Sequence, residues 1–258
     1  MRAQRELKEV KVKTVEKTLS LLELLATQNI PLSLTRIGHL SSMSISTTYR
    51  LLNTLNRSGF VERDQLTGYY QLGIKAFLIG NAALQKVELR NVALPYLNKL
   101  SKNSQESVYL AIFSRQNVFY SDCVKNNNPI QISIQTGMPF PACLTSSGKV
   151  FIAYLSLEEQ LDLIDYYARN QHIKDTQAFL KELAQIQKNG FSAGTSDFGG
   201  IVREFSAPVF KNSNVCVGAI SIFGTANSEE LTEQEKKIIT QLKNTSAEIS
   251  RALGCLNV

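Results

Sequence analysis

The sequence predicts an α+β protein in which a small helical head, closed by a hairpin, precedes a larger domain of mixed strands and helices. Before residue 60, apolar residues recur at helical spacing in three short segments, and two alternating segments then flank a turn at 64–68. Beyond residue 105, strand-like segments come first, helical spacing follows, and two further strand-like segments precede a terminal helix. A chain of 258 residues with 43% hydrophobic residues can form a core in each part.

The charges and cysteines narrow the class of protein. Residues 1–72 contain 10 Lys and Arg against 6 Asp and Glu, so they carry +4 of the net charge of +6, which favours contact with a polyanion. The four cysteines lie far apart and only two histidines occur, so we expect free thiols in a reducing cytoplasm, no metal site and no cofactor. The charged N-terminus and the lack of eighteen consecutive apolar residues predict neither an export signal nor a membrane span.

The head is predicted to contain three helices and a hairpin. The first helix runs from about residue 14 to 27, the second follows the N-cap Ser33, and the third extends from the N-cap Ser44 to Gly59. Residues 60–63 and 69–72 alternate as the two strands of the hairpin. The side chains expected to face the core are Val15, Leu19, Leu22 and Leu25 or Ala26 in the first helix, Leu34, Ile37 and Leu40 in the second, and Ile45, Thr48, Leu51, Leu52 and Leu55 in the third.

A stripe of polar side chains lies opposite the apolar face of the third helix. Its members are Ser46, Arg50, Asn53 and Arg57, with Thr47 and Thr54 beside them. A solvated helix face is usually rich in Glu and Lys, yet neither occurs between residues 44 and 59. Hydroxyl, amide and guanidinium groups hydrogen-bond to phosphates and base edges, so the stripe predicts a nucleic-acid contact. A module for protein contacts with a merely solvated polar face is the alternative.

Three helices, a tight turn before the third and a hairpin together form a winged helix-turn-helix. In this arrangement the third helix enters the major groove of double-stranded DNA by its N-terminus, and the wing lies against the backbone. Tyr70, in a wing strand, is expected to pack beneath the sheet. The residues predicted to contact DNA are Ser46, Thr47 and Arg50 at base edges, Asn53, Arg57 and Arg63 at phosphates, and Thr35, Arg36 and Ser44 at the starts of the second and third helices.

The second part begins after two helical stretches at 74–104. The first is centred on residues 75–89 and the second starts after Pro95, and their composition predicts a stiff helical connection rather than a flexible tether. Residues 107–113, 118–121, 130–134, 205–210 and 215–223 are predicted strands, and helices are expected from 149 past 158, around 180–186 up to Gly190, and at 232–253. Strands, helices, strands and a final helix indicate an α+β domain with a largely antiparallel sheet.

Residues 15–72 resemble the N-terminal domain of the IclR family of bacterial transcriptional regulators. The matching pieces are the third helix at 46–52, its exit at 55–59 and the wing ending at 68–73, whereas Thr35-Arg36 stands where the family usually has Ser-Glu. The resemblance continues through 137–141, 146–149, 189–191, 206–209 and 219–222. It implies a winged helix-turn-helix DNA-binding domain at 1–73, a linker helix at 74–90, a GAF-like effector-binding domain at 91–258, and a homodimer or homotetramer.

A run of small polar residues, Ser146-Ser147-Gly148-Lys149, opens a predicted helix. It is not a phosphate loop, because Cys143 stands where the first glycine of that motif is required. Backbone N–H groups at a helix N-terminus do bind anions, and in an IclR-type pocket they would hold the carboxylate of a small metabolite. Ordinary N-capping by Ser146 or Ser147 is the alternative.

Position by position, the resemblance places three departures in that pocket. An acidic residue of the family corresponds to Gly194, and a cysteine corresponds to Glu204. Because a buried unpaired carboxylate is costly, Glu204 is expected to pair with Arg203, to meet a ligand cation or hydroxyl, or to face water. A serine of the family matches Ser221, but the serine two residues on is Phe223 here. The predicted effector-binding residues are Cys143, Ser146, Ser147, Gly148, Arg203, Glu204 and Ser221.

We therefore expect a cytoplasmic transcriptional regulator, acting as a repressor, whose C-terminal domain senses a small organic acid and alters the spacing of its DNA-reading heads. Two alternatives belong to other classes. One is a ligand-sensing partner protein that no longer reads DNA. The other is a small-molecule enzyme using Cys143, Ser146, Ser147, Lys149 or Glu204, although the isolated His172 provides no base near a nucleophile.

Overall fold

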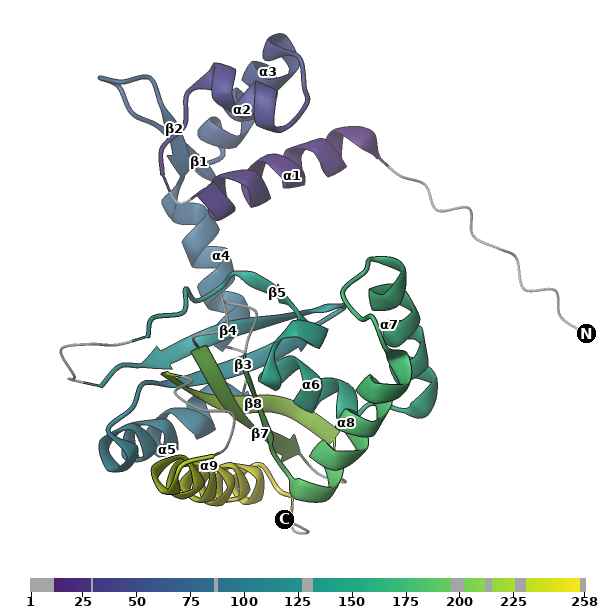
Figure 1. Ribbon diagram of the computed structural model, residues 1–258. Coiled ribbons are helices and arrows are strands. Elements are labelled where there is room, and N and C mark those ends of the chain that lie inside the picture. The colour runs from purple at the N-terminus through teal and green to yellow at the C-terminus, as the bar shows by residue number, and fades with distance from the viewer. Residues whose placement is uncertain are drawn as a thin grey trace, which may run out of the picture. The chain divides into compact units, whose positions relative to one another are not determined.

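The computed structural model describes residues 12–28, 30–85, 88–126, 132–195, 202–211, 215–225 and 231–255 (Figure 1). The chain divides into two compact units, Met1–Lys86 and Val87–Val258. No helix among these residues is long and apolar enough to cross a membrane.

The first unit is the predicted winged helix-turn-helix. Its elements are α1 (Lys13–Gln28), α2 (Leu34–Leu40), α3 (Ile45–Arg57), β1 (Val61–Arg63), β2 (Tyr70–Leu72) and α4 (Ile74–Gln85). Ser33 and Ser44 cap α2 and α3 as predicted, each accepting a backbone N–H of the first turn. Gly59 follows α3 with φ +77°, a backbone conformation that glycine adopts without strain. β1 and β2 pair antiparallel to form the wing.

The core of this unit differs from the prediction at its edges. Leu25, Ile37, Thr48, Leu52 and Leu55 are buried as expected, and so is Leu21. The prediction that Val15 and Leu19 face the core is wrong, because each residue is 53% exposed. The apolar side chains of α1 that join the cluster formed by α2, α3 and the wing lie in its C-terminal half. Ile45, at the start of α3, is also exposed rather than buried.

The connection is two helices that break at a different place from the predicted one. α4 ends at Gln85, and α5 (Glu88–Ser104) begins before Pro95 instead of after it. A proline inside a helix removes one backbone hydrogen bond. α5 is nevertheless continuous, because an unbroken face of buried side chains runs along it: Leu89, Ala93, Leu97 and Leu100.

The second unit contains a six-stranded antiparallel sheet with helices on both faces (Figure 1). The strand order is β5-β4-β3-β8-β7-β6. Its strands are β3 (Val108–Ser114), β4 (Asn117–Val124), β5 (Pro139–Pro141), β6 (Ser192–Thr195), β7 (Val202–Lys211) and β8 (Val215–Thr225), and its remaining helices are α6 (Ser146–Ala153), α7 (Leu157–Arg169), α8 (Thr176–Asn189) and α9 (Glu233–Ala252). The predicted close of α8 at Gly190 is confirmed by a left-handed C-cap.

Each face of the sheet has its own core. Side chains of α5 and α9 pack on one face together with Phe205, Ala207 and Val209 of β7. Helices α6, α7 and α8 pack on the other face against Tyr109, Tyr120 and other side chains of β3, β4 and β8. Because successive strand residues point to opposite faces, the odd positions of β7 face α9 and its even positions face α6.

One predicted strand is wrong, and two strands were missed. Residues 132–135 have no regular strand structure, and residues 130–131 lie outside the described residues. Instead, the hydroxyl of Tyr109 donates to the carbonyl of Ile132 at 3.3 Å and accepts the backbone N–H of Ile134 at 3.0 Å. The short strands β5 and β6 form the two edges of the sheet, and their prolines and glycine hid them from a search for alternating apolar residues.

Candidate DNA interface and buried carboxylate site

The polar stripe of α3 is presented to solvent. Ser46, Arg50 and Arg57 are exposed, whereas Thr47 and Asn53 are half-buried. Ser44 orders the start of the helix: its hydroxyl accepts the backbone N–H of Thr47 at 3.3 Å and donates to the Thr47 hydroxyl at 2.9 Å. The first turn of α3, which a winged helix inserts first, therefore has a fixed polar surface.

Within the described part of the chain, the positive charges near this stripe have no acidic neighbour. Residues 33–60 contain no Asp or Glu. Among the described residues, no carboxylate lies within 4 Å of the guanidinium groups of Arg36, Arg50 or Arg57. Thr35 and Arg36 are exposed in the first turn of α2, which Ser33 caps. These charges are available to phosphates.

Tyr49 belongs to the same surface and was missed. Its side chain is 47% exposed and, with Thr14, Thr47, Arg50 and Asn53, lines an open hollow of about 460 Å³. The signal was present in the sequence, since position 49 is three residues after Ser46 and four before Asn53. The predicted stripe contains only hydroxyl, amide and guanidinium side chains, and Tyr49 is aromatic.

The wing has an ordered tip. The Asp64 carboxylate accepts the backbone N–H of Leu66 at 3.0 Å, the N–H of Thr67 at 2.7 Å and the Thr67 hydroxyl at 2.8 Å, and these bonds lower the pKa of Asp64. Arg63 donates to the carbonyl of Gly68 at 3.3 Å and lies over the ring of Tyr70. Tyr70 itself is buried, which confirms that it packs beneath the wing.

The N-terminus of α6 already holds a carboxylate, that of Glu204 on β7. The backbone N of Ser146 lies 2.6 Å from Glu204 Oε2, and the backbone N of Ser147 lies 3.2 Å from Oε1. The hydroxyls of Tyr120 and Ser221 each donate to Oε1 at 2.9 Å. The prediction that these N–H groups await a ligand carboxylate is therefore corrected: an internal one takes them.

The N-cap of α6 is Thr145, which had not been predicted. The Thr145 hydroxyl accepts the backbone N–H of Gly148 at 3.0 Å, so Thr145 is the N-cap rather than Ser146 or Ser147. Glu204 is fully buried, and burial raises its pKa, although the hydrogen bonds from Tyr120, Ser221, Ser147 and Ser146 act in the opposite direction.

Arg203 and Glu204 do not pair, contrary to one of the expectations. They are adjacent on a strand and therefore point to opposite faces of the sheet. Arg203 instead donates to Glu235 of α9 at 2.9 Å, and the side chains of both are largely buried. Glu204 does not face water either, and the hydroxyls that it meets belong to the protein.

The predicted effector residues thus separate into groups. Ser146, Ser147, Glu204 and Ser221 converge, together with Tyr120, which was missed. Cys143 is buried in the 3₁₀ turn Ala142–Leu144 before α6. Gly148 allows close packing, because a Cβ there would lie 2.1 Å from the carbonyl oxygen of Ala142.

Family models match both units. The model of the IclR helix-turn-helix domain matches residues 14–65, and the model of the bacterial transcriptional regulator IclR C-terminal matches residues 81–251. The chain belongs to the IclR family of transcriptional regulators.

Relatives of known role span nearly the whole IclR-family chain. The HTH-type transcriptional regulator XynR of Escherichia coli K12 is 26% identical over 247 residues, which cover 94% of this chain and 98% of the relative. The transcriptional repressor IclR of the same organism is 28% identical over 244 residues, covering 91% of this chain and 89% of the relative.

Solved structures share the fold of this IclR-family chain. An IclR regulator from Alicyclobacillus acidocaldarius superimposes with a TM-score of 0.80 at 22% identity, covering 93% of this chain and 98% of that one. An IclR homolog from Microbacterium hydrocarbonoxydans, complexed with 4-hydroxybenzoate, does so with a TM-score of 0.78 at 18% identity, covering 93% and 99%.

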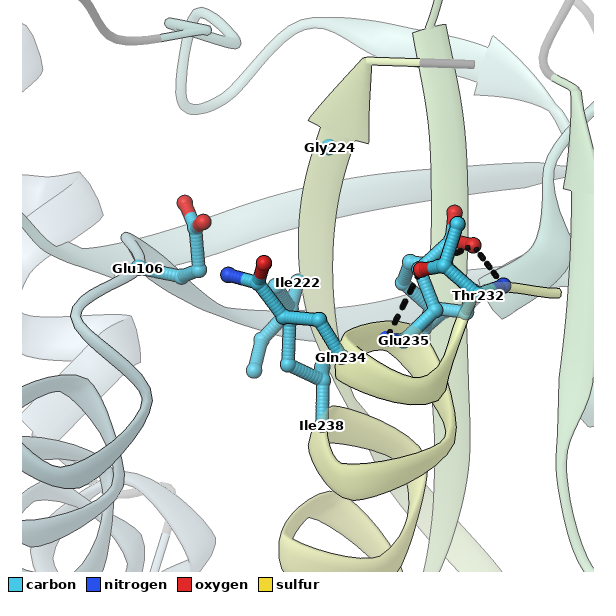
Figure 2. A pocket seen from close by; sticks show the side chains of 8 residues that line it. Glu106, Ile222, Gly224, Thr232, Gln234, Glu235 and Ile238 are labelled. Carbon is cyan, nitrogen blue, oxygen red and sulfur yellow. Dashed lines mark hydrogen bonds between the residues drawn. The ribbon is translucent and has the colours of Figure 1, made fainter. Parts of the chain in front are cut away.

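The IclR-family chain also has an open cavity on the α9 side of its sheet. It measures about 130 Å³ and is lined by Glu106, Gln234, Glu235, Thr232 and apolar side chains of β7, β8 and α9 (Figure 2). Burial raises the pKa of Glu106. Two carboxyl groups on its wall make this cavity a poor host for an acid, and it lies on the opposite face of the sheet from Glu204.

Proposed function

We propose that this IclR-family regulator reads operator DNA with the first turns of α3. Ser46, Thr47 and Arg50 would lie at base edges in the major groove, and Asn53, Arg57 and the wing residue Arg63 would lie along the phosphates. The observation that carries the proposal is an exposed, capped helix face whose guanidinium groups have no acidic neighbour within 4 Å among the described residues. Thr35, Arg36 and Ser44 would extend the same surface.

Fluorescence anisotropy with the upstream region of the chain's own operon tests this proposal. We expect salt-dependent binding that weakens roughly tenfold or more in Arg50→Ala. Arg169→Ala is the matched control, because Arg169 is an exposed arginine of α7 in the other unit. The absence of salt-dependent binding would favour a partner protein that does not read DNA. Binding that is unchanged by Arg50→Ala would contradict the contact proposed for α3.

We further propose that the first unit pairs with a second copy through an apolar surface on α1 and α4. Large apolar side chains there are exposed: Val12, Val15 and Leu19 around α1, and Ile74, Phe77, Leu78 and Ile79 on α4. Exposed apolar side chains in such number favour an interaction site. A homodimer would also provide two recognition helices for two operator half-sites.

Sedimentation of the full chain tests the dimer. Phe77→Asp should lower the sedimenting mass, because it places a charge in the proposed apolar contact. Leu157→Asp, at a similarly exposed leucine of α7, should leave the mass unchanged. If the mass of Phe77→Asp is unaltered, the copies are joined by a different surface, such as one on the second unit that holds a tetramer together.

We propose that residues 1–73 read DNA, that residues 74–90 connect the two domains, and that residues 91–258 bind the effector. The protein would act in the cytoplasm. We propose that the protein represses transcription, since relatives include a transcriptional repressor and an acetate operon repressor. A small-molecule effector is supported by the complex of the Microbacterium homolog. The backbone N–H groups of Ser146 and Ser147 do not support a carboxylate as the effector, however, because the Glu204 carboxylate already accepts their hydrogen bonds.

A regulatory rather than enzymatic role is also part of the proposal. The candidate nucleophiles of α6 are engaged: the Ser146 hydroxyl donates to the carbonyl of Glu204 at 3.0 Å, and the Ser147 hydroxyl lies 2.9 Å from that of Tyr120. Lys149 pairs with Glu182 at 2.8 Å. The relatives, moreover, are transcriptional regulators.

A further inference from the structure

The Glu204 carboxylate is held in the way that a binding site holds a ligand. Four donors from three separate segments converge on its two oxygens: the N–H groups of Ser146 and Ser147 on α6, and the hydroxyls of Tyr120 on β4 and Ser221 on β8. All four point toward the oxygens, which suits an ionised carboxylate because it only accepts. Two of them belong to a helix N-terminus, where a negative charge is favoured.

This contact is additional to the normal cap of the helix. Thr145 already caps α6 from the preceding position, whereas Glu204 comes from a strand 58 residues away along the chain. A residue that served only as a cap would satisfy the first turn locally. Thr145 therefore caps the helix, and the Glu204 carboxylate separately accepts the N–H groups of Ser146 and Ser147.

The seat is closed to solvent. Glu204, Ser147, Tyr120 and Ser221 have no exposed surface. The ring of Phe223 lies 5.5 Å from that of Tyr120, centroid to centroid, and covers the same side of the sheet. An external acid could reach these donors only by displacing Glu204, which would then be left buried without them.

We propose that Glu204 is a built-in ligand, whose carboxylate permanently fills the anion seat of the second unit and excludes small free carboxylic acids from it. This inference rests on the proposed function, since it concerns how the control domain of that regulator is filled. It follows that small monocarboxylates do not act on the natural chain through these donors. Removal of the Glu204 carboxylate would open a seat for them.

Rescue by small acids in the full chain tests this inference. Glu204→Ala deletes the atoms of an acetate unit, so formate and acetate fit the space. Thermal unfolding of this variant in sodium chloride should show a melting temperature lower by on the order of 5 °C. Formate or acetate at equal ionic strength should restore about half of that loss or more, with saturation.

Two controls make the outcome specific. The natural chain should show no rise in melting temperature with acetate beyond that with chloride. Glu204→Gln fills the seat with an amide of the same size, so it should also show no acid-dependent rise. If Glu204→Ala is unfolded in chloride, recovery of helical circular dichroism on adding acetate supports the inference equally.

Either of two results would overturn it. One is saturable stabilisation of the natural chain by acetate, since the donors would then be open to external acids. The other is a Glu204→Ala chain, folded or not, that gains nothing from formate or acetate. DNA binding of the natural chain is measured separately, so DNA binding without acid rescue refutes this inference alone, and acid rescue without DNA binding refutes only the proposed function.

Discussion

The phenol of Tyr120 donates a hydrogen bond of 2.9 Å to the carboxylate of Glu204, and both side chains are completely buried. The two residues are 84 positions apart and come from different strands of one sheet. Burial and the neighbouring charge of Glu204 both raise the pKa of Tyr120, so the phenol keeps its proton and stays a donor. This bond joins β4 to β7, and the same carboxylate accepts the N–H groups of Ser146 and Ser147 in the first turn of α6.

Tyr120→Phe should destabilise the second unit by about 1–3 kcal/mol, because it removes a donor from a buried carboxylate while keeping the ring. Urea unfolding followed by circular dichroism measures the change. Tyr166→Phe is the matched control, since Tyr166 on α7 is 44% exposed, and it should change little. Equal stability of the two variants would show that the bond does not stabilise the fold.

Gly148→Ala should destabilise the same unit by about 3 kcal/mol or more, since the new Cβ would lie 2.1 Å from the carbonyl oxygen of Ala142. Gly80→Ala in α4 is the comparison, because a Cβ there meets nothing within 4 Å. Alanine also favours a helix over glycine, so that variant should keep or gain stability. Calorimetry of both variants decides whether the close approach at Gly148 is rigid.

Glu235→Gln should lower stability at neutral pH by about 1–2 kcal/mol, because Glu235 completes the capping box of α9 and pairs with Arg203. Burial acts to raise the pKa of Glu235, but the hydrogen bonds from Thr232 and the nearby Arg203 outweigh it, so the pKa is lowered below 4.5.

A carboxylate with a lowered pKa contributes stability above its unfolded value and loses it as the pH falls through the folded value. The gap between the natural chain and Glu235→Gln should therefore be constant above about pH 5 and close below 4.5. Urea titrations from pH 7 to 3.5 test this. Glu233→Gln removes only an exposed ion pair with Lys236, which solvent screens, so it should show a much smaller gap. A gap for Glu235→Gln that widens in acid would contradict the assignment.

Arg57→Ala should weaken DNA binding about equally for all operator sequences and reduce the salt slope by about 1, because a phosphate contact carries no base information. Arg50→Ala should instead alter the preference among operators with single base changes, by about 1–3 kcal/mol at the contacted position. Anisotropy titrations at several salt concentrations separate the two. The reverse pattern would exchange the roles assigned along α3.

Much of the head could be predicted from the sequence because its information is local. The N-caps Ser33 and Ser44 and the helical spacing of Leu52 and Leu55 each depend on residues within a few positions. The exposure of Val15 and Leu19 could not be predicted in this way. Periodicity shows that a face is apolar, but only packing decides whether this unit or a second copy covers it.

The sequence by itself determined the two-part α+β organisation, the polar stripe of α3 and the small polar run that opens α6. Only the tertiary structure decided which group accepts the backbone N–H groups of that run. The antiparallel sheet places Glu204 beside Ser146 and turns Arg203 toward Glu235 on the other face. The physical reason is that strand alternation separates neighbours in sequence, while sheet pairing and helix packing bring distant donors around one buried carboxylate.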